Sequence, residues 1–91
     1  MRKSRFTPQY ARFLERLRAL KAKKGLLQAD LAERLGVPQQ CISRFENGET
    51  RLDVVQLWLY CRATGVSFTT FCRQLDKDFA DASESTPGKR R

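Results

Sequence analysis

Histidine is absent from this 91-residue chain, and tryptophan occurs only once. The three cysteines, Cys41, Cys61 and Cys72, cannot all pair within one chain and show no C-x-x-C spacing. These shortages make a zinc site improbable. The sequence also has no glycine-rich phosphate loop and no convincing nucleophile–base pair. We therefore expect neither an enzyme nor a bound metal or cofactor.

Long apolar runs are missing as well. No stretch approaches the roughly 18 apolar residues of a membrane span, and no apolar segment of a signal peptide follows the basic N-terminus. These absences predict a cytoplasmic protein with reduced cysteines and no membrane-spanning segment. Because so short a chain buries only about 60% of its unfolded surface, oligomerisation would help to stabilise it.

Positive charge is plentiful but unevenly distributed. The net charge is +8, and residues 1–25 supply all of it, with nine Lys or Arg residues against the single acid Glu15. Residues 26–91 are balanced. A basic N-terminal third indicates a polyanion, either nucleic acid or an acidic membrane surface, unless it is simply a solvated helix face.

Apolar spacing and capping residues predict five helices and no strand. The first helix follows Thr7 and ends at Gly25, and Gly36 with Pro38 forms a tight turn between the second and third helices. Including caps, the later helices are expected at residues 27–35, 38–46, 53–64 and 67–79. We divide the chain into a basic arm (1–6), a helical domain (7–79) and a disordered polar tail (80–91).

One continuous segment carries a family resemblance. Its sequence is LRALKAKKGLLQADLAERLGVPQQCISRFENG, starting at Leu17. It resembles the phage-repressor-like (Cro/XRE) helix-turn-helix family, and the likeness covers roughly Leu17 to Leu75. The matching positions are Gly25-Leu26, Gln28, Leu31-Ala32, Leu35-Gly36, Ile42-Ser43 and Glu46-Asn47-Gly48. The resemblance implies an all-α, five-helix DNA-binding domain whose second and third helices form the helix-turn-helix.

The third helix carries one polar face. Gln40, Ser43, Arg44 and Asn47 fall at i, i+3, i+4 and i+7, and Gln39 borders them. Glutamine pairs bidentately with adenine and arginine with guanine, each pair discriminating by roughly 1–3 kcal/mol. We therefore expect Gln39, Gln40 and Arg44 to read bases, with Ser43 as a further candidate. The alternative is an ordinary exposed polar face.

Other residues are expected to contact the DNA backbone. The resemblance implies phosphate contacts at Gln28 and Asn47, and Thr50 and Arg51 in the following loop are additional candidates. Such contacts fix register without reading sequence directly. We also expect the N-terminal arm to wrap the duplex, as arms do in some relatives, through Arg2, Lys3 and Arg5.

The resemblance also implies a salt bridge between Lys21 of the first helix and Glu46 of the third. The family has arginine at the first position, whereas lysine offers no bidentate fork, so a weaker or more exposed pair is expected. Leu27 and Pro38 stand where the family often has Thr and Ser caps. Losing such a cap typically costs ~1 kcal/mol.

The fourth helix is apolar on more than one face. The residues expected to face the core are Leu57, Tyr60 and Cys61, and those left over are Val55, Trp58 and Leu59. The second set is either an association surface, which Leu75 and Phe79 could extend, or a cover over its own domain. Cys41 on the third helix is either a redox switch or, more simply, a semi-buried filler.

These features predict a transcriptional regulator, acting as a repressor, that binds double-stranded DNA in the nucleoid. A homodimer would place two recognition helices about 34 Å apart on a palindromic operator. One alternative is an antitoxin, which would bind a toxin protein and autoregulate its operon. Another is a protein-interaction module that keeps this fold but does not use DNA.

Overall fold

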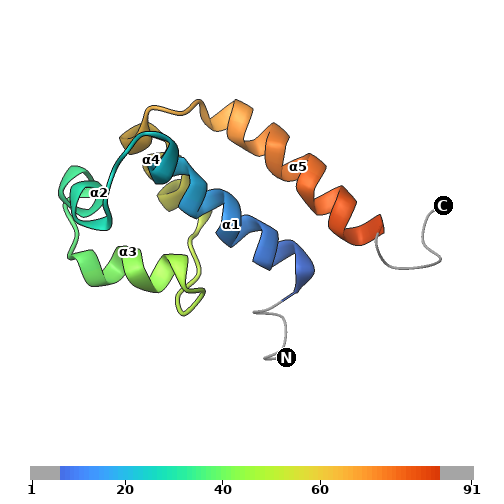
Figure 1. The fold of residues 1–91 in the computed structure, drawn as a ribbon, viewed down its shortest axis with the longest axis horizontal. Coiled ribbons are helices and arrows are strands. Elements are labelled where there is room, and N and C mark those ends of the chain that lie inside the picture. Colours follow the sequence, from blue (N-terminus) through green and yellow to red (C-terminus); the bar gives the residue numbers. More distant parts are fainter. Residues whose placement is uncertain (1–6, 85–91) are drawn as a thin grey trace.

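The computed structural model describes residues 7–84, which form five α-helices and no β-strand (Figure 1). The helices are α1 (Pro8–Lys23), α2 (Gln28–Leu35), α3 (Gln39–Glu46), α4 (Val54–Thr64) and α5 (Phe68–Glu84). The predicted all-α fold with five helices is confirmed. Helix α5 lies antiparallel along α1, and α2 and α3 pack together where α1 ends (Figure 1).

A single core joins all five helices. Each helix contributes at least one completely buried side chain to it, among them, in chain order, Leu17, Leu31, Ile42, Tyr60 and Phe71. Burying an apolar side chain of this size stabilises the fold by roughly 1.5–3 kcal/mol. Because helices of eight residues such as α2 and α3 are marginal alone, these shared contacts hold them in place. Within residues 7–84 every helix is too short or too polar to cross a membrane.

Polar side chains define where three helices begin. Thr7 Oγ1 accepts a hydrogen bond from the backbone N–H three residues on, at 3.0 Å. Asp53 and Gln56 form a reciprocal capping box at the start of α4, each accepting the other's backbone N–H at 2.8 Å. Leu27 cannot cap α2 with its side chain, and the Asp30 carboxylate instead accepts the Leu27 N–H at 2.8 Å. The starts of α1, α2 and α4 are thus fixed by nearby side chains, whereas Pro38 gives α3 no side-chain cap.

The last helix is longer than predicted. It continues to Glu84, so the polar tail expected from residue 80 is replaced by helix over residues 80–84. The reason is burial, because Ala82 lies in the interior with only 4% of its surface exposed. The arm at residues 1–6, including Arg2, Lys3 and Arg5, and the tail at residues 85–91 lie outside the described residues.

An ion pair ties α5 to α1. The Arg16 guanidinium donates from Nε and Nη2 to the two carboxylate oxygens of Asp78, at 2.5 and 3.2 Å. These hydrogen bonds hold the pKa of Asp78 below its ordinary value and raise the pKa of Arg16. The paired form is therefore the stable form at neutral pH.

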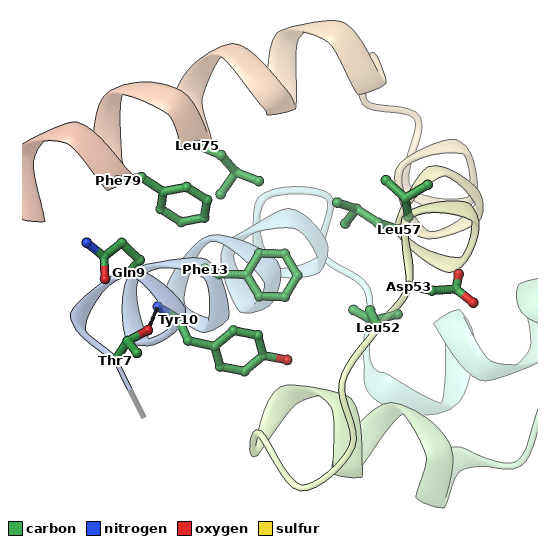
Figure 2. A pocket seen from close by; sticks show the side chains of 10 residues that line it. Thr7, Gln9, Tyr10, Phe13, Leu52, Asp53, Leu57, Leu75 and Phe79 are labelled. Carbon is green, nitrogen blue, oxygen red and sulfur yellow. Dashed lines mark hydrogen bonds between the residues drawn. The ribbon is translucent and has the colours of Figure 1, made fainter. Parts of the chain in front are cut away.

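Leu75 and Phe79 face the interior of the molecule. Both line an apolar pocket of about 320 Å³ between α1, the start of α4 and α5, opposite Tyr10 and Phe13 (Figure 2). Leu75 is buried and Phe79 packs against the core. The suggestion that they extend an exposed patch on α4 is therefore wrong, because the antiparallel packing of α5 on α1 turns them inward.

Candidate nucleic-acid interface

The turn between α2 and α3 sets which side of α3 faces outward. Gly36 has φ 71°, a left-handed conformation that glycine adopts without steric cost, and it ends α2. Pro38 then precedes α3 in an extended conformation. Ile42 anchors the inner side of α3, since it is completely buried. The α3 outer face, defined here as Gln39, Gln40, Ser43 and Arg44, remains accessible.

The four predicted base-reading residues share this α3 outer face. Gln39, Gln40 and Arg44 are exposed, and Ser43 is half-buried. Their amide and guanidinium groups supply donors and acceptors suited to base edges. The structure brings these side chains together on one short helix, as their spacing predicted.

Gln28 lies beside the N-terminus of α3 rather than pointing freely outward. Its Nε2 donates to Glu46 Oε1 at 3.0 Å, and its Oε1 accepts from Gln39 Nε2 at 3.3 Å. The predicted phosphate contact and a predicted base-reading residue are therefore hydrogen-bonded to each other. A nucleic-acid backbone that approaches Gln28 also meets Gln39.

Glu46 is the buried anchor of this arrangement, with 2% of its surface exposed. Lys21 Nζ lies 3.4 Å from its Oε1, and the Tyr60 hydroxyl donates to its Oε2 at 2.7 Å. The predicted pair is thus in contact, and it lies largely inside the molecule. Gln28 and Tyr60 supply the donors that a single lysine lacks, which lets the carboxylate stay inside.

Tyr60 itself is shaped by this contact. Burial first, and then the hydrogen bond to the Glu46 carboxylate, raise the pKa of Tyr60 above its ordinary value. The neutral phenol is therefore the form that donates. Sequence reasoning placed Tyr60 in the core but missed this polar role, because nothing in a helix pattern pairs residues 14 positions apart.

Arg18 is a second residue that sequence reasoning missed. Its Nη1 donates at 2.7 Å to the backbone carbonyl of Glu46, the last residue of α3. A cation at a helix C-terminus also interacts favourably with the helix dipole. One sequence signal for this contact was available, because Arg18 lies three residues before Lys21 and therefore on the same side of α1. Together these two residues fix the C-terminal end of α3 to α1.

The remaining phosphate candidates follow the C-terminal end of α3. Asn47 and Thr50 are exposed, and Asn47 Nδ2 lies 3.5 Å from Ser43 Oγ. The Arg51 guanidinium lies over the Tyr10 ring, 4.2 Å from its centroid. Gln28 is hydrogen-bonded to Gln39, the first residue of α3, whereas these groups follow its last residue, and eight helical residues span about 12 Å. They suit contacts to two separate stretches of backbone.

A separate exposed surface lies on α4. We define the α4 outer face as Val55, Trp58, Leu59 and Arg62, which recur at helical spacing. The apolar members are 61%, 42% and 43% exposed, and the Arg62 guanidinium lies 4.9 Å from the Trp58 ring centroid. This face is apolar where the α3 outer face is polar.

Cys41 sits between the two outer faces. It is half-buried and lines a small apolar pocket of about 160 Å³, together with Leu35 of α2, Phe45 of α3 and Leu59 of α4. Its surroundings match a space-filling role. Cys61 is buried, and burial raises the pKa of its thiol to about 11. The thiol is therefore protonated at neutral pH.

Comparisons with known proteins agree on the fold and on the motif. A helix-turn-helix family model matches residues 17–71, from the middle of α1 into α5. The solved structure of an XRE-family like protein from Pseudomonas syringae pv. tomato is similar, with 35% sequence identity and a TM-score of 0.73. The match covers 76% of this chain and 84% of that one. No curated protein sequence matches the chain significantly.

Proposed function

The chain belongs to the Cro/XRE-type helix-turn-helix family of DNA-binding transcription regulators, and we propose that it is a repressor. In this proposal it binds a palindromic operator in the cytoplasm as a homodimer, and bound protein excludes RNA polymerase. The described residues 7–84 form a single helical domain.

The observation that carries the proposal is the α3 outer face. Its exposed amides and guanidinium stand on a helix held at both ends, by Gln28 near its start and by Arg18 at its last carbonyl. A recognition helix enters the major groove with its N-terminal residues toward the bases. Gln39 and Gln40 occupy that end, and Arg44 follows one turn later. We assign base reading to these three, with Ser43 as a further contact.

Phosphate binding is assigned to both ends of α3. Gln28 serves one end, and Asn47, Thr50 and Arg51 serve the other. Residues 28–48 carry three acids against two arginines, so long-range attraction to DNA is supplied by the basic residues before them. Deleting residues 1–5 should lower the salt slope of binding by about 0.9 for each phosphate that the arm neutralises. An unchanged slope would exclude the arm from the interface.

The homodimer is assigned to the α4 outer face. Exposed Val55, Trp58 and Leu59 form a stripe that the described helices leave uncovered. A two-fold axis places one such face against its own copy and buries both. Two recognition helices then reach successive major grooves, with half-sites about 34 Å apart.

Selection of bound duplexes from a random pool tests the whole proposal. The purified full chain should enrich a palindrome whose half-sites are spaced by one helical turn, about 10–10.5 base pairs. Enrichment of a single asymmetric site would contradict the homodimer. Failure to enrich any sequence would contradict specific DNA binding and favour an interaction module on the same fold.

A second candidate function is supported by the α4 outer face alone. An antitoxin would use this apolar stripe to hold a toxin protein while α3 binds the shared operator. The oligomeric state of the purified protein in solution separates the two candidate functions. A dimer at micromolar concentration supports the homodimeric repressor, whereas a monomer whose α4 outer face stays open supports a different protein partner.

A further inference from the structure

Three side chains form a hydrogen-bonded series from the core to the α3 outer face. Glu46 accepts from Gln28 at 3.0 Å, and Gln28 accepts from Gln39 at 3.3 Å. At the inner end the Glu46 carboxylate also contacts the Lys21 ammonium and the Tyr60 hydroxyl. The inner end is buried and the outer end is exposed. We propose that Glu46 is a positioning residue that fixes the amide orientation of Gln28 and, through it, of Gln39.

The direction of the series follows from what each group can do. A carboxylate paired with an ammonium has no proton to donate, so it accepts at every contact. Gln28 must therefore turn its Nε2 toward Glu46, which leaves its Oε1 toward Gln39. Gln39 must in turn offer its Nε2 to Gln28. The buried Glu46 carboxylate thus sets the orientation of both amide groups, although Gln28 and Gln39 themselves carry no charge.

This orientation decides what Gln39 presents to DNA. One of its two N–H groups is used by Gln28, so its Oε1 and its second N–H remain. An acceptor beside a donor matches N6 and N7 of adenine. In the reversed orientation Oε1 would be used by Gln28, and two N–H groups would remain, which match the two acceptors of guanine. Glu46 therefore favours adenine over guanine at the position that Gln39 reads.

The inference rests on the proposed function, and its test separates the two. Duplex pools are selected with the wild type and with Gln39→Ala, which identifies the base pair that Gln39 reads. The informative variant is Lys21→Met/Glu46→Gln, because removing both charges leaves no unpaired ion in the core. The new amide at residue 46 can donate as well as accept, so both orientations of Gln28 become available.

In this double variant the adenine-to-guanine preference at the Gln39 position should fall at least about 5-fold, while the positions read by Gln40 and Arg44 keep theirs. Gln28→Met removes the middle member of the series and leaves Lys21 and Tyr60 on the Glu46 carboxylate. It should lower the same preference, and an unchanged preference overturns the series even if the double variant does not fold. Tyr60→Phe is the matched control. It removes a donor to the other Glu46 oxygen and should leave that preference unchanged.

Each outcome has one meaning. A wild-type chain that enriches no motif overturns the proposed function and the series with it. A wild-type motif whose Gln39 position keeps its preference in Gln28→Met overturns the series alone. An equal loss at every position in the double variant also overturns it, because a purely structural defect would act on all contacts.

Discussion

The outer faces of α3 and α4 make an instructive contrast. Both helices bury one side in the same core, α3 through Ile42 and α4 through Leu57. On the opposite side α3 carries amides and a guanidinium, whereas α4 carries exposed Trp58 and Leu59. The core sets only the inner sides, so the chemistry of the outer sides reports what each helix meets. We assign nucleic acid to the first and protein to the second.

The two helices also differ in where their polar contacts lie. Helix α4 is fixed by apolar burial, by its capping box and by hydrogen bonds at Tyr60 and at the Ala63 carbonyl. Helix α3 has polar contacts along its length, with Arg18 on its last carbonyl and Glu46 and Gln39 joined through Gln28. Polar contacts are directional, so they define the orientation of a base-reading helix more strictly than apolar packing does.

The largest expected effect comes from placing a charge on the α4 outer face. Trp58→Glu should abolish the dimer and weaken binding to a two-half-site duplex by about 30-fold or more, because a central aromatic anchor is worth about 2 kcal/mol or more. Sedimentation velocity and duplex titration measure both. Arg73→Glu, at an exposed site on α5, is the control. A Trp58→Glu chain that remains dimeric would mean that Trp58 only covers its own domain.

Truncating the α3 outer face should leave assembly intact. Arg44→Ala is expected to remove roughly 1–3 kcal/mol of discrimination at one operator position without changing the dimer. Competition titrations with single-base variants of the selected duplex measure this reduction. Arg73→Ala serves as the control for the removal of a positive charge. A uniform weakening across all duplexes would instead make Arg44 a phosphate contact.

High pH should destabilise the fold through Cys61 on the inner side of α4. Burial raises the pKa of Cys61 to about 11 from 9.0, so the folded state favours the neutral thiol. The resulting stability is complete below pH 9 and is lost as pH rises toward 11, on the order of 2 kcal/mol. Chemical denaturation at a series of pH values measures the decline. In Cys61→Ala the decline between pH 9 and 10 should disappear, and its persistence would contradict the assignment.

The smallest effect is expected away from both outer faces. The Arg16–Asp78 pair lowers the pKa of Asp78, so its stabilisation is present above about pH 4 and is lost as pH falls further. Because the Arg16 side chain is 37% exposed, Asp78→Asn should cost at most about 1 kcal/mol. Denaturation at pH 7 and at successively lower pH should show the difference between variant and wild type shrinking as pH falls below about 4. DNA preference should not change.

The architecture was predictable because it is encoded locally. The spacing of Leu17, Leu31 and Ile42 marked inner sides, and Gly36 marked the turn, so the five helices could be placed from sequence. The end of α5 was predicted too early in the chain, because the buried Ala82 stands among polar residues in the sequence. Its burial depends on tertiary packing, which no local pattern encodes.

The candidate site was predictable only in outline. Helical spacing places Gln39, Gln40 and Arg44 on one side, whatever the rest of the fold does. The bond from Gln28 to Glu46 joins residues 18 positions apart and depends on three helices meeting. The hydrogen bond from Arg18 spans 28 positions. Such contacts follow from tertiary packing, so sequence periodicity cannot reveal them.

One titration tests the central claim most directly, namely that the α3 outer face reads DNA. The wild type and the triple variant Gln39→Ala/Gln40→Ala/Arg44→Ala are titrated with the selected duplex and with a scrambled duplex at the same salt concentration. Specific sites commonly bind at least about 1,000-fold more tightly than scrambled DNA. We predict that this preference collapses in the triple variant while the dimer stays folded. A triple variant that keeps the wild-type preference would contradict the account.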